Sequence, residues 1–137
     1  MSATFVDTNI FLRHLLNDHP THSPAAFRLI QSIERGKQIA WTSELVVAGL
    51  VWVLSSKQGY QLPRERIGSL LVPLLSLPSL KVPHKRLYPR IFDLYVRLPI
   101  DYVDAYHAAL IQHRSEHELY SFDTDFDHVQ GLTRREP

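Results

Sequence analysis

Hydrophobic and polar positions along the chain switch between two periods, and this switching predicts short strands separated by amphipathic helices. The first residues form an apolar run that ends in an acid at Asp7, and apolar side chains then recur at helical spacing over residues 10–16. Further short apolar runs at 38–42, 80–83 and 119–122 predict strands. Strands that alternate with helices are typical of the α/β class, with a parallel sheet covered by helices.

Capping residues and prolines indicate where the helices begin and end. Ser23 is expected to be the N-cap of a second helix, and Ser43 caps a strongly apolar third helix that Gly59 closes. Pro73 is expected to kink a fourth helix or to end its first half. The basic residues 84–86 are expected at the solvated start of a fifth helix. The apolar face expected for the second helix consists of Ala26, Phe27, Ile30 and Ile33.

The length of 137 residues fits a single domain, 1–137. Hydrophobic residues make up 45% of the chain, but no uninterrupted apolar run approaches the roughly 20 residues needed to span a bilayer, so no membrane segment is expected. The absence of Cys and of secretory-signal features favours a cytoplasmic location. A net charge of +1 gives no global attraction for nucleic acid, so binding would depend on how the charges are distributed.

Acidic residues lie where predicted strands end and predicted helices begin. Asp7 follows the first strand, Asp101 and Asp104 flank a helix start, and Asp123 and Asp125 follow the strand at the end of the chain. These positions meet at the carboxyl edge of a parallel sheet, where ligands bind in open α/β folds. Gathered carboxylates repel one another and suit magnesium or manganese better than zinc. Phosphodiester hydrolysis fits such a site, although Asp7 taken alone is more simply explained as a helix cap.

Four segments in this order resemble the successive motifs of one family: FVDTNIFLRHLL, SELVVAGLVWVL, DYVDAYHAAL and YSFDTDF. They are similar to those of the PIN-domain family, especially the VapC-type ribonuclease toxins of toxin–antitoxin pairs. The resemblance implies a three-layer α/β/α domain with a central, mostly parallel sheet of four to five short strands. It also implies an endoribonuclease that depends on Mg²⁺ or Mn²⁺, forms a homodimer and is inhibited by a small antitoxin protein.

The resemblance also implies roles for individual residues. The acids that match the family's catalytic positions, or lie directly beside one, are Asp7, Asp104, Asp123 and Asp125. The implied metal ligands among them are Asp7, Asp104 and Asp123. The residues expected to support the site are Asn9, Ser121 and Asp101.

One position departs from the family pattern. Gly49 stands where the family has an acid in its third helix, and Glu44 cannot replace that acid because five residues of helix rotate a side chain by about 140°. Either the active site is weakened or lost, or the glycine is an introduced substitution that quiets a harmful nuclease. Two hypotheses remain open: an active ribonuclease, or a catalytically inactive PIN-fold module that binds RNA or an antitoxin.

Two shorter patterns indicate other chemistry. Residues 113–117 match the H-x-x-E-H pattern of inverted zinc metallopeptidases, but they lie at a predicted helix end rather than inside a long helix. The segment Asp7-Thr8-Asn9 is similar to the nucleophile loop of haloacid dehalogenase phosphatases, which need an acid where this chain has Asn9. His107 shares a helix face with Asp104 and could contact substrate, although a packed or surface histidine is the simpler interpretation.

Overall fold

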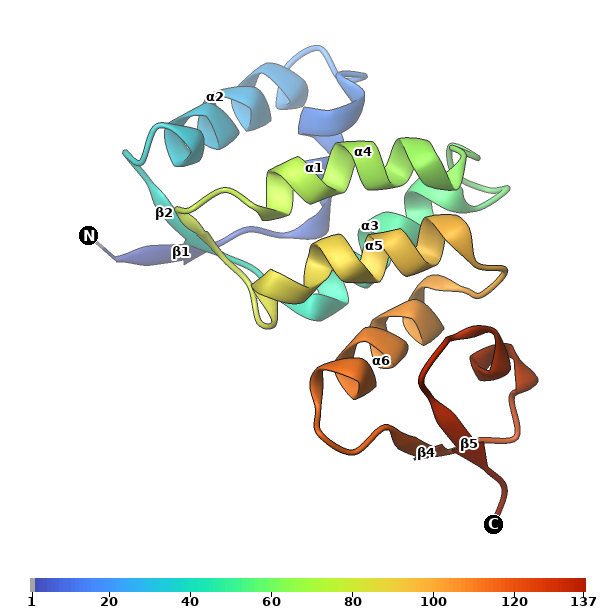
Figure 1. Ribbon diagram of the computed structural model, residues 1–137. Helices are drawn as coiled ribbons and strands as arrows, with labels where there is room; N and C mark the ends of the chain where they lie inside the picture. The colour runs from blue at the N-terminus through green and yellow to red at the C-terminus, as the bar shows by residue number, and fades with distance from the viewer. Residues whose placement is uncertain (1) are drawn as a thin grey trace. The chain divides into compact units, whose positions relative to one another are not determined.

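The computed structural model describes residues 2–137 and divides the chain into two compact units, Met1–Lys85 and Arg86–Pro137 (Figure 1). Each unit has its own strands and helices. The expectation of one domain over 1–137 stays a prediction. None of the helices in the described part of the chain is long and apolar enough to cross a membrane.

The first unit is built from two successive crossovers between parallel strands. Its elements are, in order, β1 (Ala3–Phe5), α1 (Thr8–Leu16), α2 (His22–Glu34), β2 (Ile39–Trp41), α3 (Glu44–Ser55), α4 (Arg64–Leu75) and β3 (Leu80–Lys81). The strands pair in parallel in the order β1-β2-β3, with two helices in each connection. Parallel neighbours require such long crossovers because the chain must return to the starting edge of the sheet.

Ala40 of the central strand β2 is fully buried, and so is Leu80, its partner in β3. Phe5 and Trp41 are partners in the β1–β2 register, and their rings meet edge to face at 4.7 Å. The core of the unit is formed mainly by one face each of α1, α2, α3 and α4, as their amphipathic spacing predicts. Its fully or nearly fully buried side chains include Phe11, Ile33, Val47, Leu50, Leu54, Ile67, Leu71 and Leu75.

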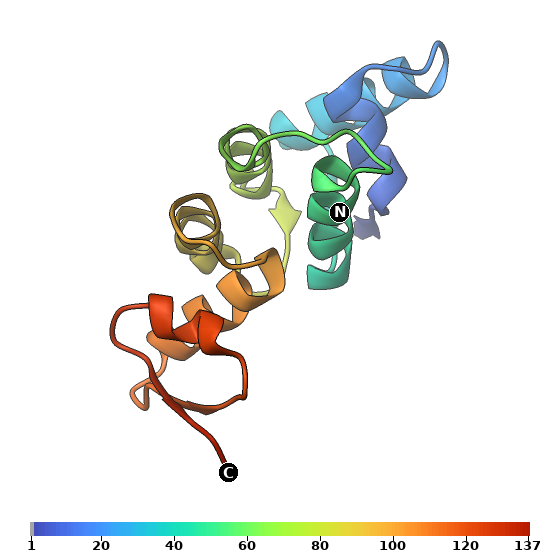
Figure 2. The same ribbon diagram turned by 90° about the vertical axis from the view of Figure 1, so that its right-hand side faces the viewer.

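The second unit joins two helices to a second parallel strand pair. A 3-10 turn, η1 (Lys85–Leu87), precedes α5 (Tyr88–Arg97), α6 (Tyr102–His113), β4 (Glu118–Tyr120), the 3-10 helix η2 (Thr124–His128) and β5 (Thr133–Arg135). Figures 1 and 2 show α5 and α6 next to each other. Aromatic rings fill this contact. The ring centroid of Tyr102 in α6 lies 5.4 Å from that of Phe92 and 5.9 Å from that of Tyr95, both in α5.

The predicted α/β class is confirmed, with helices packed around parallel strands. The grouping of the strands differs from the expected single central sheet, because the five strands of the described residues form one sheet of three and one of two. β4 pairs with β5 from Glu118↔Thr133 to Tyr120↔Arg135. The sequence of β5, Thr-Arg-Arg, has no apolar alternation, so the hydrophobic pattern could not predict this partner.

Three helix ends differ from the predictions. Ser23 is not the N-cap of α2: the helix begins at His22, with Thr21 as its N-cap residue, and the Ser23 hydroxyl accepts a hydrogen bond from the backbone N–H of His19. The imidazole of His19 serves the helix start instead, since its Nδ1 accepts from the backbone N–H of His22 at 2.9 Å. α3 ends at Ser55 rather than at Gly59, and α4 continues past Pro73 to Leu75, because a proline this close to the last turn removes little of the hydrogen-bond ladder.

The basic residues 84–86 form a solvated helix start only in part, because His84 and Arg86 are exposed but Lys85 is not. His84 adopts a left-handed backbone with φ of 57°. Lys85 is half-buried, and its ammonium group donates to the backbone carbonyls of Leu77 and Leu80. Burial lowers the pKa of Lys85 from its usual value. The lysine therefore satisfies carbonyl groups around β3, which gives it a structural role that charge patterning alone does not reveal.

Candidate metal centre

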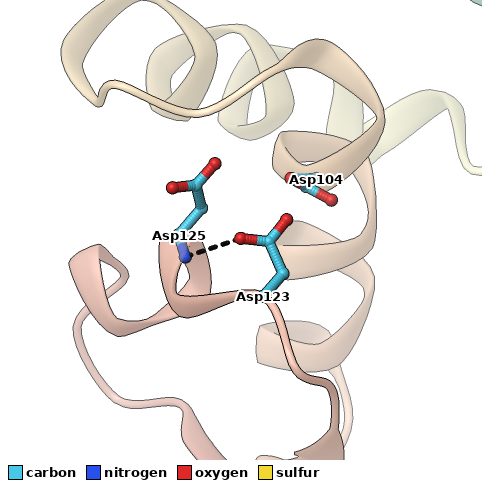
Figure 3. Close-up of side chains that lie close together, drawn as sticks. All are labelled: Asp104, Asp123 and Asp125. Atoms are coloured by element: carbon cyan, nitrogen blue, oxygen red, sulfur yellow. Dashed lines mark hydrogen bonds between the residues drawn. The ribbon is translucent and has the colours of Figure 1, made fainter.

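Three carboxylates meet in the second unit. Asp104 lies in the first turn of α6, Asp123 lies between β4 and η2, and Asp125 lies in η2. One carboxylate oxygen from each of the three lies within 4.8 Å of the others (Figure 3). Asp123 is exposed, whereas Asp104 and Asp125 are half-buried. The structure thus brings together three of the acids that the sequence singles out, Asp104, Asp123 and Asp125.

Two helix caps hold this arrangement. Asp101 is the N-cap of α6, and its Oδ1 accepts from the backbone N–H of Asp104 at 2.8 Å. Asp123 plays the same part for η2, because its Oδ1 accepts from the backbone N–H of Asp125 at 2.8 Å, the bond drawn in Figure 3. Aspartate is a preferred N-cap because its oxygen satisfies an amide that the helix leaves unpaired. Each cap uses one oxygen, so the second oxygen of Asp123 remains available.

The segment before Asp123 is held by a serine and an arginine. The backbone N–H of Asp123 donates to Ser121 Oγ at 3.0 Å, as expected for a supporting residue. Arg134 of β5 donates to the backbone carbonyl of Ser121 at 2.9 Å and forms ion pairs with Asp127 at 3.0 Å and Glu136 at 2.8 Å. These contacts lower the pKa of Asp127 and raise that of Arg134. Sequence reasoning missed Arg134, since an arginine in a short polar segment near the end of the chain carries no distinguishing signal.

The environment of Asp104 disfavours its charged form. Burial, followed by repulsion from Asp101, Asp123 and Asp125, raises the pKa of Asp104 from 3.8 to about 6, and nearby His107 opposes this shift. Hard divalent cations prefer oxygen ligands and would relieve this repulsion. The donor set, three carboxylates with no sulfur or imidazole among the clustered groups, therefore fits Mg²⁺ or Mn²⁺ better than zinc.

The predicted site residues Asp7 and Asn9 belong to the first unit. Asp7 caps α1, with Oδ1 accepting from the backbone N–H of Thr8 at 2.7 Å, and Asn9 is exposed on the first turn of α1. The backbone just before Asp7 is fixed, because Thr42 Oγ1 donates to the carbonyl of Val6 at 2.8 Å. The cap uses only one carboxylate oxygen of Asp7. Because Asp7 is exposed, the other oxygen is available to solvent or a ligand.

Gly49 faces the start of α1 within the same unit. A Cβ atom built on Gly49 would lie 3.7 Å from Thr8 Oγ1 and 3.9 Å from Thr8 Cγ2. Both distances are ordinary van der Waals contacts, so the backbone of α3 has room for a side chain here. A residue at position 49 would therefore point toward the residue that follows Asp7, whereas Glu44 lies in the first turn of α3.

The H-x-x-E-H pattern is not a zinc site. α6 ends at His113, so His117 lies outside the helix, and its Nε2 contacts the backbone carbonyl of Arg114 at 2.8 Å. Neither histidine belongs to the one metal-type cluster among the described residues. His107 is exposed, and its ring packs edge to face against that of Tyr106, with the ring centroids 5.6 Å apart.

A comparison with known families agrees with this geometry. The family model described as PIN domain matches residues 4–132, and no curated protein matches the chain. The match includes Asp7, Asp104, Asp123 and Asp125 and spans both units. PIN domains are generally metal-dependent nucleases. The chain therefore belongs to the PIN-domain family.

Proposed function

We propose that the chain is a Mg²⁺- or Mn²⁺-dependent endoribonuclease that hydrolyses RNA phosphodiesters. The observation that carries this proposal is the meeting of Asp104, Asp123 and Asp125, with carboxylate oxygens within 4.8 Å of one another, in a member of a nuclease family. Asp104 and Asp123 would hold the ion, and Asp125 assists them. Asp7 is assigned to the same chemistry by its match to the family motif.

The chain's residues have separate tasks in this proposal. Asp101 and Ser121 position the acids through the backbone of Asp104 and Asp123. When bound, the cation supplies an activated water and stabilises the charge that develops on phosphate oxygens. Since the pKa of Asp104 is about 6, the carboxylate is mostly ionised at pH 7.5 and available as a ligand.

RNA cleavage tests the proposal directly. The purified protein is incubated with a fluorescent single-stranded RNA in Mg²⁺, in Mn²⁺ and in EDTA. We expect cleavage with either ion, none in EDTA, and at least a hundred-fold loss in Asp104→Asn. Asp93→Asn is the matched control, because Asp93 lies on α5 and pairs with Arg90 and Arg97 outside the cluster. Cleavage that persists in EDTA, or that survives in Asp104→Asn, contradicts the metal-dependent site.

A second candidate function is a catalytically inactive module that binds RNA or an antitoxin. Gly49 favours it, because a glycine replaces the acid that the family motif has at this position. Gly49→Glu distinguishes the two functions. The Cβ fits beside Thr8, and Glu is a better helix former than Gly by several tenths of a kcal/mol, so the variant should fold.

The two functions predict different results for this variant. If the wild-type chain cuts RNA and Gly49→Glu cuts faster, the site is active and weakened by the glycine. If only Gly49→Glu cuts, the natural chain is a binding module with an otherwise intact site. Gly49→Ala serves as the control for helix propensity and packing, since it adds a Cβ without a carboxylate. A Gly49→Glu variant that melts lower in both Mg²⁺ and EDTA and cuts no RNA would mean that position 49 does not serve the site.

We further propose that the chain is a VapC-like toxin that acts in the cytoplasm, forms a homodimer and binds a small antitoxin protein. The support is exposed apolar surface on α3, where Leu45 is 83% and Trp52 is 65% exposed, seven residues apart and hence on one face. Other apolar residues of α3 and α4 that could have joined this surface are buried or half-buried: Val46, Leu50, Val53, Leu70, Leu71, Leu74 and Leu75.

Sedimentation tests the homodimer. We expect the wild-type protein to sediment as a dimer and the double variant Leu45→Glu, Trp52→Glu as a monomer with an unchanged melting temperature. A single monomer species across a wide concentration range contradicts self-association. A short DNA-binding protein encoded beside this chain, co-purifying with it, is the expected antitoxin.

A further inference from the structure

A groove lies along α1 and α2 of the first unit and has no role in the proposed chemistry. Its volume is about 450 Å³, enough for one aromatic ring system with its substituents. The residues that line it are His14, Asn17, Ser23, Pro24, Phe27 and Arg28. All come from the helix pair or from the turn at the end of α1.

One wall of the groove is a pair of stacked rings. Phe27 and His14 lie with ring centroids 5.8 Å apart and planes 27° from parallel. Phe27 was expected in the core, yet it is 53% exposed, because Ala26, Ile30 and Ile33 occupy the buried face of α2. Burial lowers the pKa of His14, against the opposing charge of Glu34, so its ring is neutral at pH 7.5. The groove therefore presents a flat, uncharged aromatic wall to solvent.

Polar groups surround this wall. Arg28 is exposed and forms no ion pair within the described residues, in contrast to Arg13 of α1, which pairs with Asp18 at 2.6 Å. Asn17 is the C-cap of α1 in a left-handed conformation, and its amide side chain lines the groove. The Nδ1 atom of His14 is buried without a hydrogen-bond partner, which is unusual for a histidine whose role is only structural.

We propose that this groove binds a nucleobase of single-stranded RNA, with the base stacked on Phe27 and an adjacent phosphate at Arg28. An exposed aromatic ring beside an unpaired cation is the combination that single-stranded nucleic acid uses, since every base has a face that stacks and every nucleotide carries a phosphate. Asn17 supplies an amide that can pair with a base edge. The inference rests on the proposed ribonuclease function and deepens it by naming a second set of residues that holds the RNA substrate.

RNA binding measured without cleavage tests this site. A fluorescein-labelled ten-nucleotide single-stranded RNA is titrated with protein in EDTA, and anisotropy reports the affinity. We expect Phe27→Ala to weaken binding between about five-fold and a hundred-fold, the range found for removal of one stacked base. Phe27→Trp should retain the affinity, because it keeps an aromatic face. Tyr120→Ala is the matched control, as it removes an exposed aromatic ring from β4, outside the groove.

The salt dependence of RNA binding tests the role of Arg28 separately. Arg28→Gln should reduce the slope of log affinity against log salt concentration by about 0.7, the value for one phosphate contact on a single strand. Arg35→Gln, which removes an exposed arginine at the other end of α2, should leave the slope unchanged. A probe of the same length without bases should bind wild type and Phe27→Ala equally, because stacking is then absent from both.

The outcomes separate this inference from the proposed function. If wild type binds and cuts RNA but Phe27→Ala binds as tightly as wild type, the groove does not hold a base and the ribonuclease proposal stands. If Phe27→Ala and Tyr120→Ala weaken binding equally, the effect is nonspecific and the inference is wrong. If wild type neither binds nor cuts RNA, both proposals fail. Weaker binding in Phe27→Ala alone, with rescue in Phe27→Trp, supports the groove whether or not the protein cuts.

Discussion

Replacing Asp104 by Asn should stabilise the metal-free protein at neutral pH and greatly weaken its response to Mg²⁺. The pKa of Asp104 is raised from 3.8 to about 6 by burial and by neighbouring acids, so the folded state favours the protonated carboxyl. Asparagine resembles that protonated form in shape and charge. The variant therefore removes the cost that the wild-type chain bears when Asp104 ionises.

The size of the effect follows from the shift. At about 1.4 kcal/mol per pKa unit, the change from 3.8 to about 6 corresponds to roughly 3 kcal/mol. Asp104 is only half-buried, so solvent screening reduces this to about 1–2 kcal/mol. Loss of a carboxylate from the first turn of α6 removes a favourable interaction with the helix dipole of about 0.5 kcal/mol. A net gain of about 1 kcal/mol remains, or roughly 3 °C in Tm.

The pH dependence has a definite sign. Because the pKa of Asp104 is higher in the folded state, its stabilising protonation is complete below about pH 4 and is lost as pH rises through about 6. Wild type and Asp104→Asn should therefore have similar free energies of unfolding at pH 4 and differ by the full amount above pH 7. Thermal melts of both proteins in EDTA, from pH 4 to above pH 7, measure this difference in the free energy of unfolding.

Two comparisons decide whether the reasoning holds. In Mg²⁺ the wild type should gain stability because the ion binds only the folded protein, whereas Asp104→Asn should gain much less. Asp93→Asn is expected to change in the opposite direction, because hydrogen bonds and charge from Arg97 and Arg90 lower the pKa of Asp93 and favour its ionised form. If Asp104→Asn melts lower than wild type in EDTA at pH 7.5, the repulsion assigned to Asp104 is wrong. If the variant gains as much stability from Mg²⁺ as wild type does, Asp104 is not a ligand.

Three further substitutions test the framework of the two units. His19→Ala should lower the free energy of unfolding by about 1 kcal/mol in a denaturant titration, because α2 loses its side-chain cap, whereas the exposed His128→Ala should not. Thr42→Val should cost about 1–2 kcal/mol by leaving the buried carbonyl of Val6 unpaired, which amide hydrogen exchange at the start of α1 would report as faster opening. Arg134→Gln should weaken Mg²⁺ binding measured by calorimetry while every carboxylate of the cluster is retained; unchanged affinity would show that the guanidinium does not position the acid loop.

The sequence predicts the acid cluster better than it predicts the strands around it. Asp104 and Asp123 stand at element boundaries, where capping preferences and strand ends fix the position of a side chain locally, and the structure brings them together with Asp125. Strand β5 could not be predicted in this way, since Thr-Arg-Arg gains its strand conformation from pairing with β4 and not from its own pattern. The same holds for Arg134, whose contacts depend on that pairing.

Helical periodicity has a similar limit in the first unit. The spacing of Ala26, Ile30 and Ile33 correctly predicts the buried face of α2. Phe27 lies about 100° from Ala26 around the helix axis, at the edge of that face, where hydrophobicity alone cannot decide between core and surface. The exposure of Phe27 depends on how α2 packs against α1, and this tertiary packing cannot be derived from the local sequence.

The position of Arg134 near the end of the chain has a practical consequence for protein engineering. Residues 133–137, Thr-Arg-Arg-Glu-Pro, have no hydrophobic pattern, so a shortened variant could be designed without them. This truncation would delete β5 together with the guanidinium that bridges the Ser121 carbonyl, Asp127 and Glu136. A protein shortened after residue 132 would keep Asp7, Asp104, Asp123 and Asp125 but lose the arginine that holds the loop before Asp123. An inactive truncated protein would then be a poor guide to whether the full chain is an enzyme.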